Sequence, residues 1–164
     1  MEFVSHYLQS ERLLGLSTGI IGVLSIIIGL FFLLTKPQFK AFAITMLIIG
    51  TIEAGVFITG YFIVNNETKV NSKIEVYENA PKDYLEKDKI VIERNLKLFF
   101  ILKCIYGSLF LILAIILSKA TLKPQYFGIL TALMIHFAIA VVIDTFGEHY
   151  TKNYQKEINK QLNI

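Results

Sequence analysis

Four long apolar stretches, separated by polar segments, make up most of this chain of 164 residues. They cover residues 13–34, 41–64, 98–117 and 125–147, and each carries apolar side chains around its whole circumference. A helix needs about 20 apolar residues to cross a bilayer core of roughly 30 Å, and each stretch is about that long. Helices that are apolar all round cannot enclose one soluble core. The pattern therefore predicts an all-α fold, an integral membrane four-helix bundle formed as a single domain by residues 1–164.

The long polar segment over residues 65–97 is predicted to be helical as well. It keeps apolar residues such as Val70, Ile74 and Tyr77 at helical spacing. The sequence Asn79-Ala80-Pro81 is a turn signal, and proline suits the first position of the helix that follows. We expect the second and third long helices to project beyond the bilayer and to meet at this turn as an extramembrane helical hairpin.

The two short turns, residues 36–40 and 118–124, indicate the orientation in the membrane. They contain no acidic residue and four lysines, Lys36, Lys40, Lys119 and Lys123. Dense positive charge in short loops favours the cytoplasmic side, whereas a raw count of Lys and Arg favours the opposite orientation. We expect a multi-pass protein of a bacterial inner membrane, with the short turns in the cytoplasm and with both termini and the hairpin in the periplasm.

Composition narrows the class of protein. The chain is 54% hydrophobic, with a formal charge of +3. Lysines that flank apolar spans meet anionic lipid headgroups, and no zinc-knuckle or helix-turn-helix pattern accompanies them, so no nucleic-acid partner is expected. The single cysteine, Cys104, excludes an intrachain disulfide. No nucleophile elbow, phosphate-binding loop or dinucleotide motif is present, so we expect no catalytic residues, no cofactor and no metal site.

Four ionisable residues lie inside the apolar stretches and can be paired by depth. Glu53 and His136 lie about 12 and about 11 residues into spans that run in the same direction, so both should sit near the midplane. Lys103 and Asp144 should share a depth near the opposite surface. Placing such a group at the centre of a bilayer costs roughly 2.5–3.5 kcal/mol, so each is expected to pair with another polar group. Each pair could serve as a proton relay or cation site, or simply as a hydrogen bond between helices.

Two further sets of polar residues are candidates for binding. The first is an outer-rim cluster at the ends of the spans, in which a salt-bridge network is favoured over a metal site: His6, Glu11, Arg12, Arg94, Asp144, Glu148 and His149. The second is the turn of the hairpin, where we expect a partner to bind: Asn79, Pro81, Asp83, Tyr84 and Asp88.

Small residues indicate where the spans pack together. Gly15, Gly22 and Gly29 follow one another at intervals of seven residues, and Gly50 and Gly60 share a face with the acid of the second span. Small side chains let helices approach closely in lipid. We expect these glycines to pack within the chain, and a homo-oligomeric surface is the alternative.

The chain opens with the residues Phe3-Val4-x-His6-Tyr7-x-Gln9-x-Glu11-Arg12-Leu13. This opening and the general layout resemble small four-span bacterial inner-membrane proteins of unassigned function. Some small multi-span proteins of this build are immunity proteins against antibacterial toxins, so the resemblance allows such a role. The chain differs from small multidrug exporters, because it is longer and its buried acid lies in the second span.

The expected function is therefore binding. We expect a non-enzymatic membrane protein with an immunity or regulatory role, whose partner is a protein such as a toxin or a secretion component. The alternative is a proton- or cation-coupled carrier or channel that uses Glu53 and His136. Four helices leave little room for a pathway, so that alternative would need a homo-oligomer.

Overall fold

The computed structural model describes residues 2–64 and 66–163, which are helical almost throughout and contain no strand. In chain order the elements are α1 (Glu2–Thr35), η1 (Pro37–Phe39), α2 (Lys40–Phe57), η2 (Ile58–Val64), α3 (Glu67–Asn79), α4 (Pro81–Lys119) and α5 (Pro124–Gln161). Four helices are long and apolar enough to cross a membrane: α1, α2 with its extension, α4 and α5. The prediction of an all-helical chain with four such helices is confirmed.

Prolines begin three of the elements. Pro37, Pro81 and Pro124 stand in the first turns of η1, α4 and α5, where the missing N–H leaves no hydrogen bond unmade. α3 ends at Asn79 and α4 begins at Pro81, which confirms the predicted turn. The second long helix ends as predicted near residue 64, but its last part, η2, is a π-helix.

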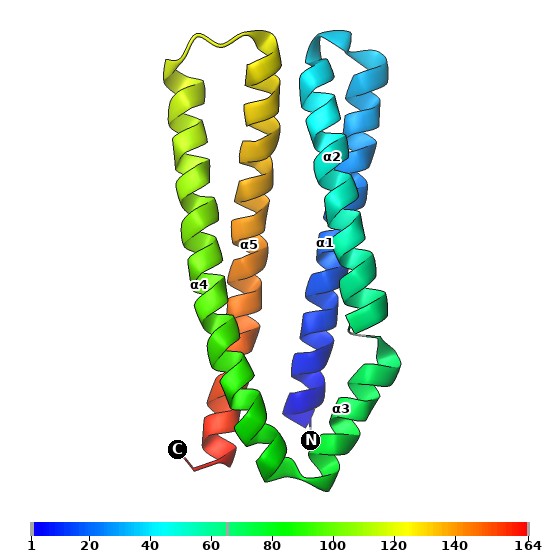
Figure 1. Ribbon diagram of the computed structural model, residues 1–164, viewed down its shortest axis with the longest axis vertical. Coiled ribbons are helices and arrows are strands. Elements are labelled where there is room, and N and C mark those ends of the chain that lie inside the picture. Colours follow the sequence, from blue (N-terminus) through cyan, green and yellow to red (C-terminus); the bar gives the residue numbers. More distant parts are fainter. Residues whose placement is uncertain (1, 65, 164) are drawn as a thin grey trace.

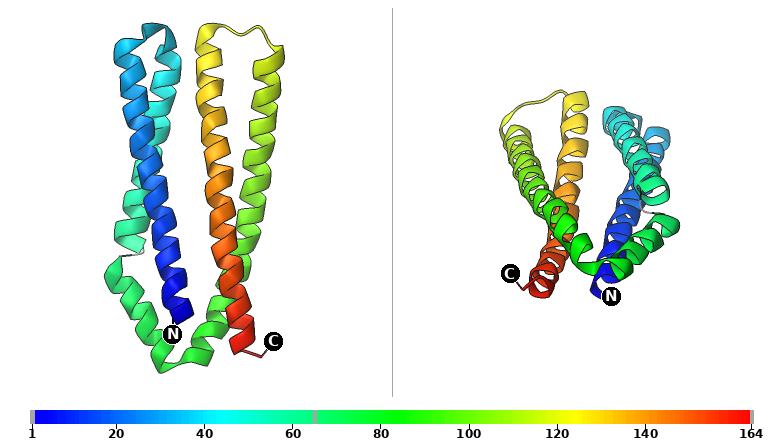
Figure 2. Two further views of the ribbon diagram at one scale, coloured as in Figure 1. Left: turned by 180° about the vertical axis from the view of Figure 1, so that it is seen from behind. Right: turned by 60° about the horizontal axis from the view of Figure 1, so that its bottom comes forward.

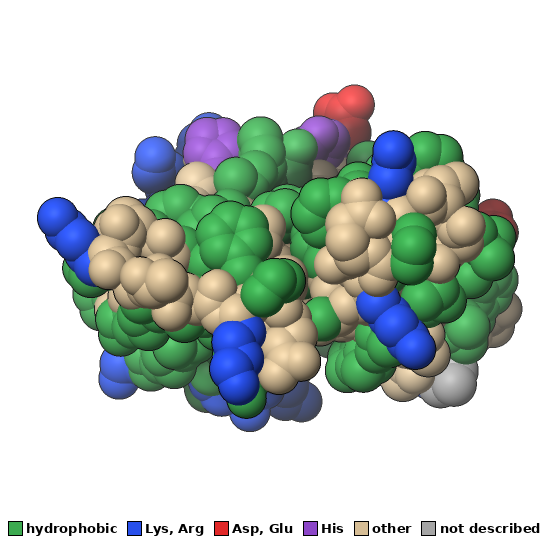
Figure 3. All heavy atoms as spheres, turned by 90° about the horizontal axis from the view of Figure 1, so that it is seen from above, with side chains coloured by type: hydrophobic (Ala, Val, Ile, Leu, Met, Phe, Trp, Pro, Cys, Tyr) green, Lys and Arg blue, Asp and Glu red, His purple; other side chains and the backbone are tan. Residues whose placement is uncertain are grey.

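The long helices form two hairpins that lie side by side (Figures 1 and 2). α1 packs along α2, α4 packs along α5, and α5 also contacts both α1 and α2. The two ends of the chain and the turn between α3 and α4 lie at one end of the molecule, and the two short turns lie at the other. Figure 3 looks onto the short-turn end, where Lys and Arg side chains project around hydrophobic ones.

Where the apolar parts of the helices pack together, small side chains predominate at the buried positions and large aliphatic ones at the surface, which is the opposite of a soluble protein. Small residues occupy most of the buried positions, namely Gly19, Gly22, Gly29, Ala43, Gly50, Gly128 and Ala132, and Met46, Ile49 and Leu113 are the large apolar residues buried here among the described ones. Large aliphatic side chains point outward, and Leu34, Ile52 and Ile115 are each more than 60% exposed. In water this arrangement would leave much apolar surface unburied, whereas lipid covers it at no cost. The fold is therefore suited to an apolar solvent along this part of its length.

Glycines bring α1 and α2 into backbone contact. A Cβ atom added to Gly50 would lie 2.6 Å from the carbonyl oxygen of Gly22, and one added to Gly29 would lie 2.9 Å from that of Ala43. The predicted intrachain packing holds for these three glycines. It is wrong for Gly15 and Gly60, which have open space around them.

Candidate functional site

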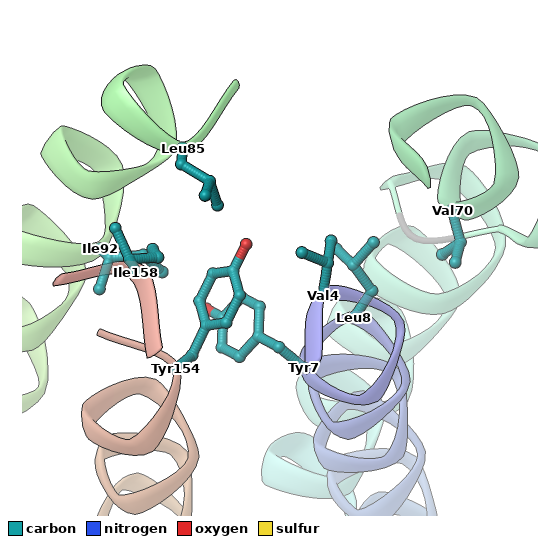
Figure 4. Packing of buried hydrophobic residues seen from close by; sticks show 8 residues of the cluster. All are labelled: Val4, Tyr7, Leu8, Val70, Leu85, Ile92, Tyr154 and Ile158. Carbon is teal, nitrogen blue, oxygen red and sulfur yellow. The ribbon is translucent and has the colours of Figure 1, made fainter. Parts of the chain in front are cut away.

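The end of the molecule that carries both termini forms a compact unit, which we call the end lobe. It consists of residues 2–12 of α1, all of α3, residues 81–97 of α4 and residues 148–161 of α5. These segments come from the beginning, middle and end of the chain and meet around a core of large side chains (Figure 4): Val4, Tyr7, Leu8, Val70, Leu85, Ile92, Tyr154 and Ile158. Unlike the apolar part, the end lobe is packed as a water-soluble domain is packed.

Two tyrosines join α1 to α5 at the centre of this core. The rings of Tyr7 and Tyr154 stack with their centroids 4.0 Å apart and their planes 2° from parallel. The Tyr7 hydroxyl donates a hydrogen bond to Oε1 of Glu11 at 2.7 Å, and the Tyr154 hydroxyl donates one to Oδ2 of Asp88, also at 2.7 Å. The second bond ties α5 to α4. The stacked pair therefore links three helices through both ring contacts and hydrogen bonds to carboxyl groups.

Burial shifts the titration of both carboxyl groups. It raises the pKa of Glu11 and of Asp88 above their ordinary values, and the bonds from Tyr7 and Tyr154 and the charge of Lys73 offset this only in part. Burial, with the nearby Asp88 carboxylate, also raises the pKa of Tyr84 to about 12. The folded end lobe thus binds protons more tightly than the unfolded chain does.

The end lobe is expected to lose stability as pH rises. Because the folded pKa values of Glu11 and Asp88 are raised, their stabilising contribution is fully present below about pH 4, near the unfolded values, and is lost as pH rises through the folded values. Hydrogen exchange of residues 67–97, corrected for the intrinsic rate at each pH, should show protection falling over this window. The variant with both Glu11→Gln and Asp88→Asn should flatten the slope, and protection that increases with pH would contradict the argument.

A cleft of about 460 Å³ opens on the end lobe between α1 and α5. Its walls include four aromatic residues, Phe3, Tyr7, Tyr150 and Tyr154, and two acidic ones, Glu2 and Glu157. Aromatic side chains with a polar rim are the composition typical of the centre of a protein interface.

Glu53 and His136 lie in contact between α2 and α5. Oε1 of Glu53 is 3.0 Å from Nδ1 of His136, so the structure brings together the two residues that the depth argument pairs. The Glu53 residue is only 7% exposed. Its other oxygen, Oε2, is buried and has no hydrogen-bond partner within residues 2–64 and 66–163. The pair can hold a proton between carboxylate and imidazole, and one carboxylate oxygen stays available.

The two residues of the second predicted pair lie near each other, since the charge of Lys103 acts on the Asp144 carboxyl group, but the lysine bonds to an acid one helical turn away. Lys103 donates to Oε2 of Glu148, not to Asp144, and Lys152 lies 2.9 Å from the other oxygen of Glu148. Glutamate has a longer side chain than aspartate and lies one turn nearer the end lobe, where the Lys103 ammonium can reach it. Oδ2 of Asp144 stays buried without a hydrogen-bond partner in the part of the chain that the structure describes.

The predicted outer-rim residues have their contacts elsewhere. Glu11 is held by Tyr7, the Arg12 guanidinium lies 4.7 Å from the centre of the Tyr61 ring, and His149 contacts Asn153 at 3.1 Å. His6 lines the cleft between α1 and α5, and Arg94 is exposed. Within the described ranges no three His, Cys, Asp or Glu residues are placed to hold a metal ion.

The predicted partner-binding residues of the hairpin divide into two groups. Asn79, Pro81 and Asp83 are exposed at the turn, as a binding role requires. Tyr84 and Asp88 point inward, because Asp88 accepts the bond from Tyr154 and Tyr84 packs edge-on against Tyr77. These two residues support the hairpin and do not form its outer surface.

Sequence reasoning missed the tyrosine core and the cleft. Val4, Tyr7 and Leu8 are spaced along one face of α1, and Tyr154 and Ile158 are spaced four apart on α5, so each helix carried a signal of burial. Which helices those faces would meet depends on the order of the helices in space, which spacing along the chain does not give.

Comparison with family models, with curated proteins and with solved structures finds no match to this chain.

Proposed function

We propose that this multi-pass chain is a non-enzymatic protein of a bacterial inner membrane that acts by binding a protein partner through its end lobe. The observation that carries the proposal is the change of packing along the molecule. Small residues predominate at the buried positions of the apolar part, where Met46, Ile49 and Leu113 are also buried, whereas the core of the end lobe consists of large apolar and aromatic side chains. A core of the second kind stabilises a fold in water, which favours an end lobe that projects beyond the bilayer.

The exposed surface of the end lobe supports binding of a protein. Ile90 is 71% exposed, and its neighbours one turn away on α4 are all charged: Glu86, Lys87, Glu93 and Arg94. An exposed aliphatic side chain inside a charged rim is the arrangement found at many protein interfaces. Because the core fixes the backbone of α3 and α4, this surface needs little ordering when a partner binds, and that preorganisation favours affinity.

The concrete form of the proposal is an immunity or regulatory protein with the end lobe and termini in the periplasm. A partner such as a toxin or a secretion component would meet the end lobe there, and the lysines of the short turns would face the cytoplasm.

Capture of the partner tests this proposal. The full chain in detergent is used to recover the products of the neighbouring genes, and is compared with a variant that carries Asp83→Lys and Ile90→Glu. Both side chains are exposed, so the fold should persist while recovery falls by about tenfold or more, the effect of losing one interface hot spot. The matched control is Gln38→Lys with Thr121→Glu, which adds the same two charges at exposed positions of the short turns and keeps all four of their lysines. Equal recovery from wild type and the end-lobe variant would refute the role of this surface.

A second candidate, a proton- or cation-coupled carrier or channel, is favoured by the geometry of Glu53 and His136. The two side chains are 3.0 Å apart between apolar helices, and Oε2 of Glu53 has no partner within the described residues. An ionisable pair in such a place is typical of a proton relay, although the same contact also serves as a hydrogen bond between helices. A pathway across the membrane would require a homo-oligomer.

Flux measurements separate this candidate from the first. In proteoliposomes with an imposed pH gradient, wild type should carry protons or a monovalent cation, and Glu53→Gln should reduce the flux to that of empty liposomes. Glu93→Gln, on the exposed surface, is the control for the loss of one carboxylate. Absence of flux from wild type would dismiss the carrier and leave the pair as a structural contact.

A further inference from the structure

We propose that the cleft between α1 and α5 of the end lobe binds a basic, amphipathic segment of the partner protein. The inference rests on the proposed function, and it names the chemistry of the segment that enters this cleft. Three features of the cleft carry it: a rigid aromatic floor, acidic groups on both walls, and a length that suits two turns of a helix.

The floor of the cleft is apolar and fixed in place. It is lined by Phe3 and Tyr150, which are partly exposed, and by the small exposed parts of the stacked Tyr7 and Tyr154 rings, which are 6% and 3% exposed. The centroid of the Phe3 ring lies 5.7 Å from that of Tyr154. The hydroxyls of Tyr7 and Tyr154 are held by carboxylates on the far side, so the rings cannot rotate away without losing those bonds. An apolar side chain that enters the cleft therefore meets a surface that is already ordered.

Both walls of the cleft carry negative charge. Glu2 lies on the α1 wall and Glu157 on the α5 wall, and no Lys or Arg lines the cleft among the described residues. Lys160 lies 3.9 Å from Glu157, but its side chain is 75% exposed, so this pair is weak and screened by solvent. With His6 counted as neutral, the lining of the cleft holds two acids and no lysine or arginine, whereas the chain as a whole has a charge of +3. The negative charge of the cleft therefore favours a ligand with positive charge.

The length of the cleft suits a short helical or extended segment. On α1 the lining residues run from Glu2 to Ser10, which is about 12 Å along the axis, or two helical turns. Asn153, which is exposed on the α5 wall, adds a polar group that can bond to a backbone or to a side-chain amide. An amphipathic segment would place its apolar side chains on the aromatic floor and its Lys or Arg side chains against Glu2 and Glu157.

A pair of synthetic peptides tests the inference. The full chain is placed in nanodiscs of uncharged phosphatidylcholine, and binding of a fluorescent 14-residue Leu/Lys helix is compared with that of the matching Leu/Glu helix by anisotropy. The Leu/Lys peptide should bind, should bind more weakly as salt rises, and should lose about tenfold in affinity with the double variant Glu2→Gln and Glu157→Gln. The control variant, Glu75→Gln with Glu78→Gln on exposed α3, removes the same charge and should leave affinity unchanged.

Each contrary result has a defined meaning. Equal binding of the two peptides, equal binding to empty nanodiscs, or equal losses in the cleft and control variants would overturn the inference. If capture of the native partner depends on Asp83 and Ile90 but not on Glu2 and Glu157, the inference fails while the proposed function stands. If the basic peptide binds in the cleft but no native partner is recovered, the proposed function fails instead.

Discussion

Replacing Ile92 by Ala is expected to destabilise the end lobe by about 2–5 kcal/mol, the usual cost of truncating a large aliphatic side chain in a packed core. Ile92 is 1% exposed and belongs to the cluster that contains Tyr154 and Ile158. It lies on α4, while the other two residues lie on α5. Its side chain therefore helps to hold the hairpin against the end of the last helix, and its loss leaves a cavity that rigid neighbours fill poorly.

Ile90 provides a matched control, because the same chemical change can be made two residues away on the same helix. It is 71% exposed, so Ile90→Ala removes little buried area and should cost less than about 0.5 kcal/mol. Hydrogen exchange in nanodiscs should show loss of protection over residues 67–97 for Ile92→Ala only. Equal losses for the two variants would mean that the end lobe has no specific core.

The Ile92 variant also tests whether the end lobe can open while the apolar parts of the helices stay folded. The apolar parts of α1, α2 and α5 pack against one another largely through small residues that lie outside the end lobe. Their protection should persist when the end lobe opens. A chain in which both regions lost protection together would instead behave as one cooperative unit.

The depth of a residue along its helix could be predicted from the sequence, but the residue that it meets on the neighbouring helix could not. Glu53 and His136 could be paired because each residue advances a helix by a fixed rise of about 1.5 Å, so counting from the short turns gives the depth. The same counting brought Lys103 near Asp144, but it could not give the bonded partner, because a long lysine side chain reaches a full turn along its neighbour and Glu148 offers the longer carboxylate.

The glycines show a similar limit. An ideal helix drifts by only about 20° for each interval of seven residues, so glycines at that spacing stay near one face of the helix. Gly22 and Gly29 lie within the α1–α2 seam, whereas Gly15 has no atom within 4 Å of its added Cβ. The spacing identified the correct face but could not say where along the helix the contact would end.

The end lobe was predictable only as a helical hairpin. Its core needs Tyr7 from the beginning of the chain and Tyr154 from the end to meet over a distance of 147 residues in sequence. No local pattern encodes such a contact, because it follows from the way α5 packs between the first hairpin and α4. The cleft between α1 and α5, which depends on the same packing, was therefore beyond sequence reasoning.

Replacing Gly50 by Ala is expected to destabilise the contact between α1 and α2 by about 1–3 kcal/mol, the usual cost of overpacking. The added Cβ would lie 2.6 Å from the carbonyl oxygen of Gly22 and 2.9 Å from the backbone nitrogen of Ile26. Backbone atoms of a helix cannot move aside singly, so the two helices must separate along the seam. In lipid no hydrophobic effect opposes this separation, because tails cover the exposed surface as well as the partner helix does, so the contact depends on the close packing that the added Cβ removes.

Gly55→Ala is the matched control, since Gly55 lies on the same helix and has nothing within 4 Å of its added Cβ. It should leave stability unchanged or raise it slightly through the better helix propensity of alanine. Unfolding in mixed micelles, followed by circular dichroism, measures both variants. Because Glu53 lies one turn beyond Gly50 on the same helix, a shift of α2 at the seam should also change its contact with His136 of α5, which nuclear magnetic resonance of the imidazole nitrogens would report. A Gly50→Ala protein with wild-type stability and an unchanged His136 signal would show that the close approach of the two backbones does not support the buried pair.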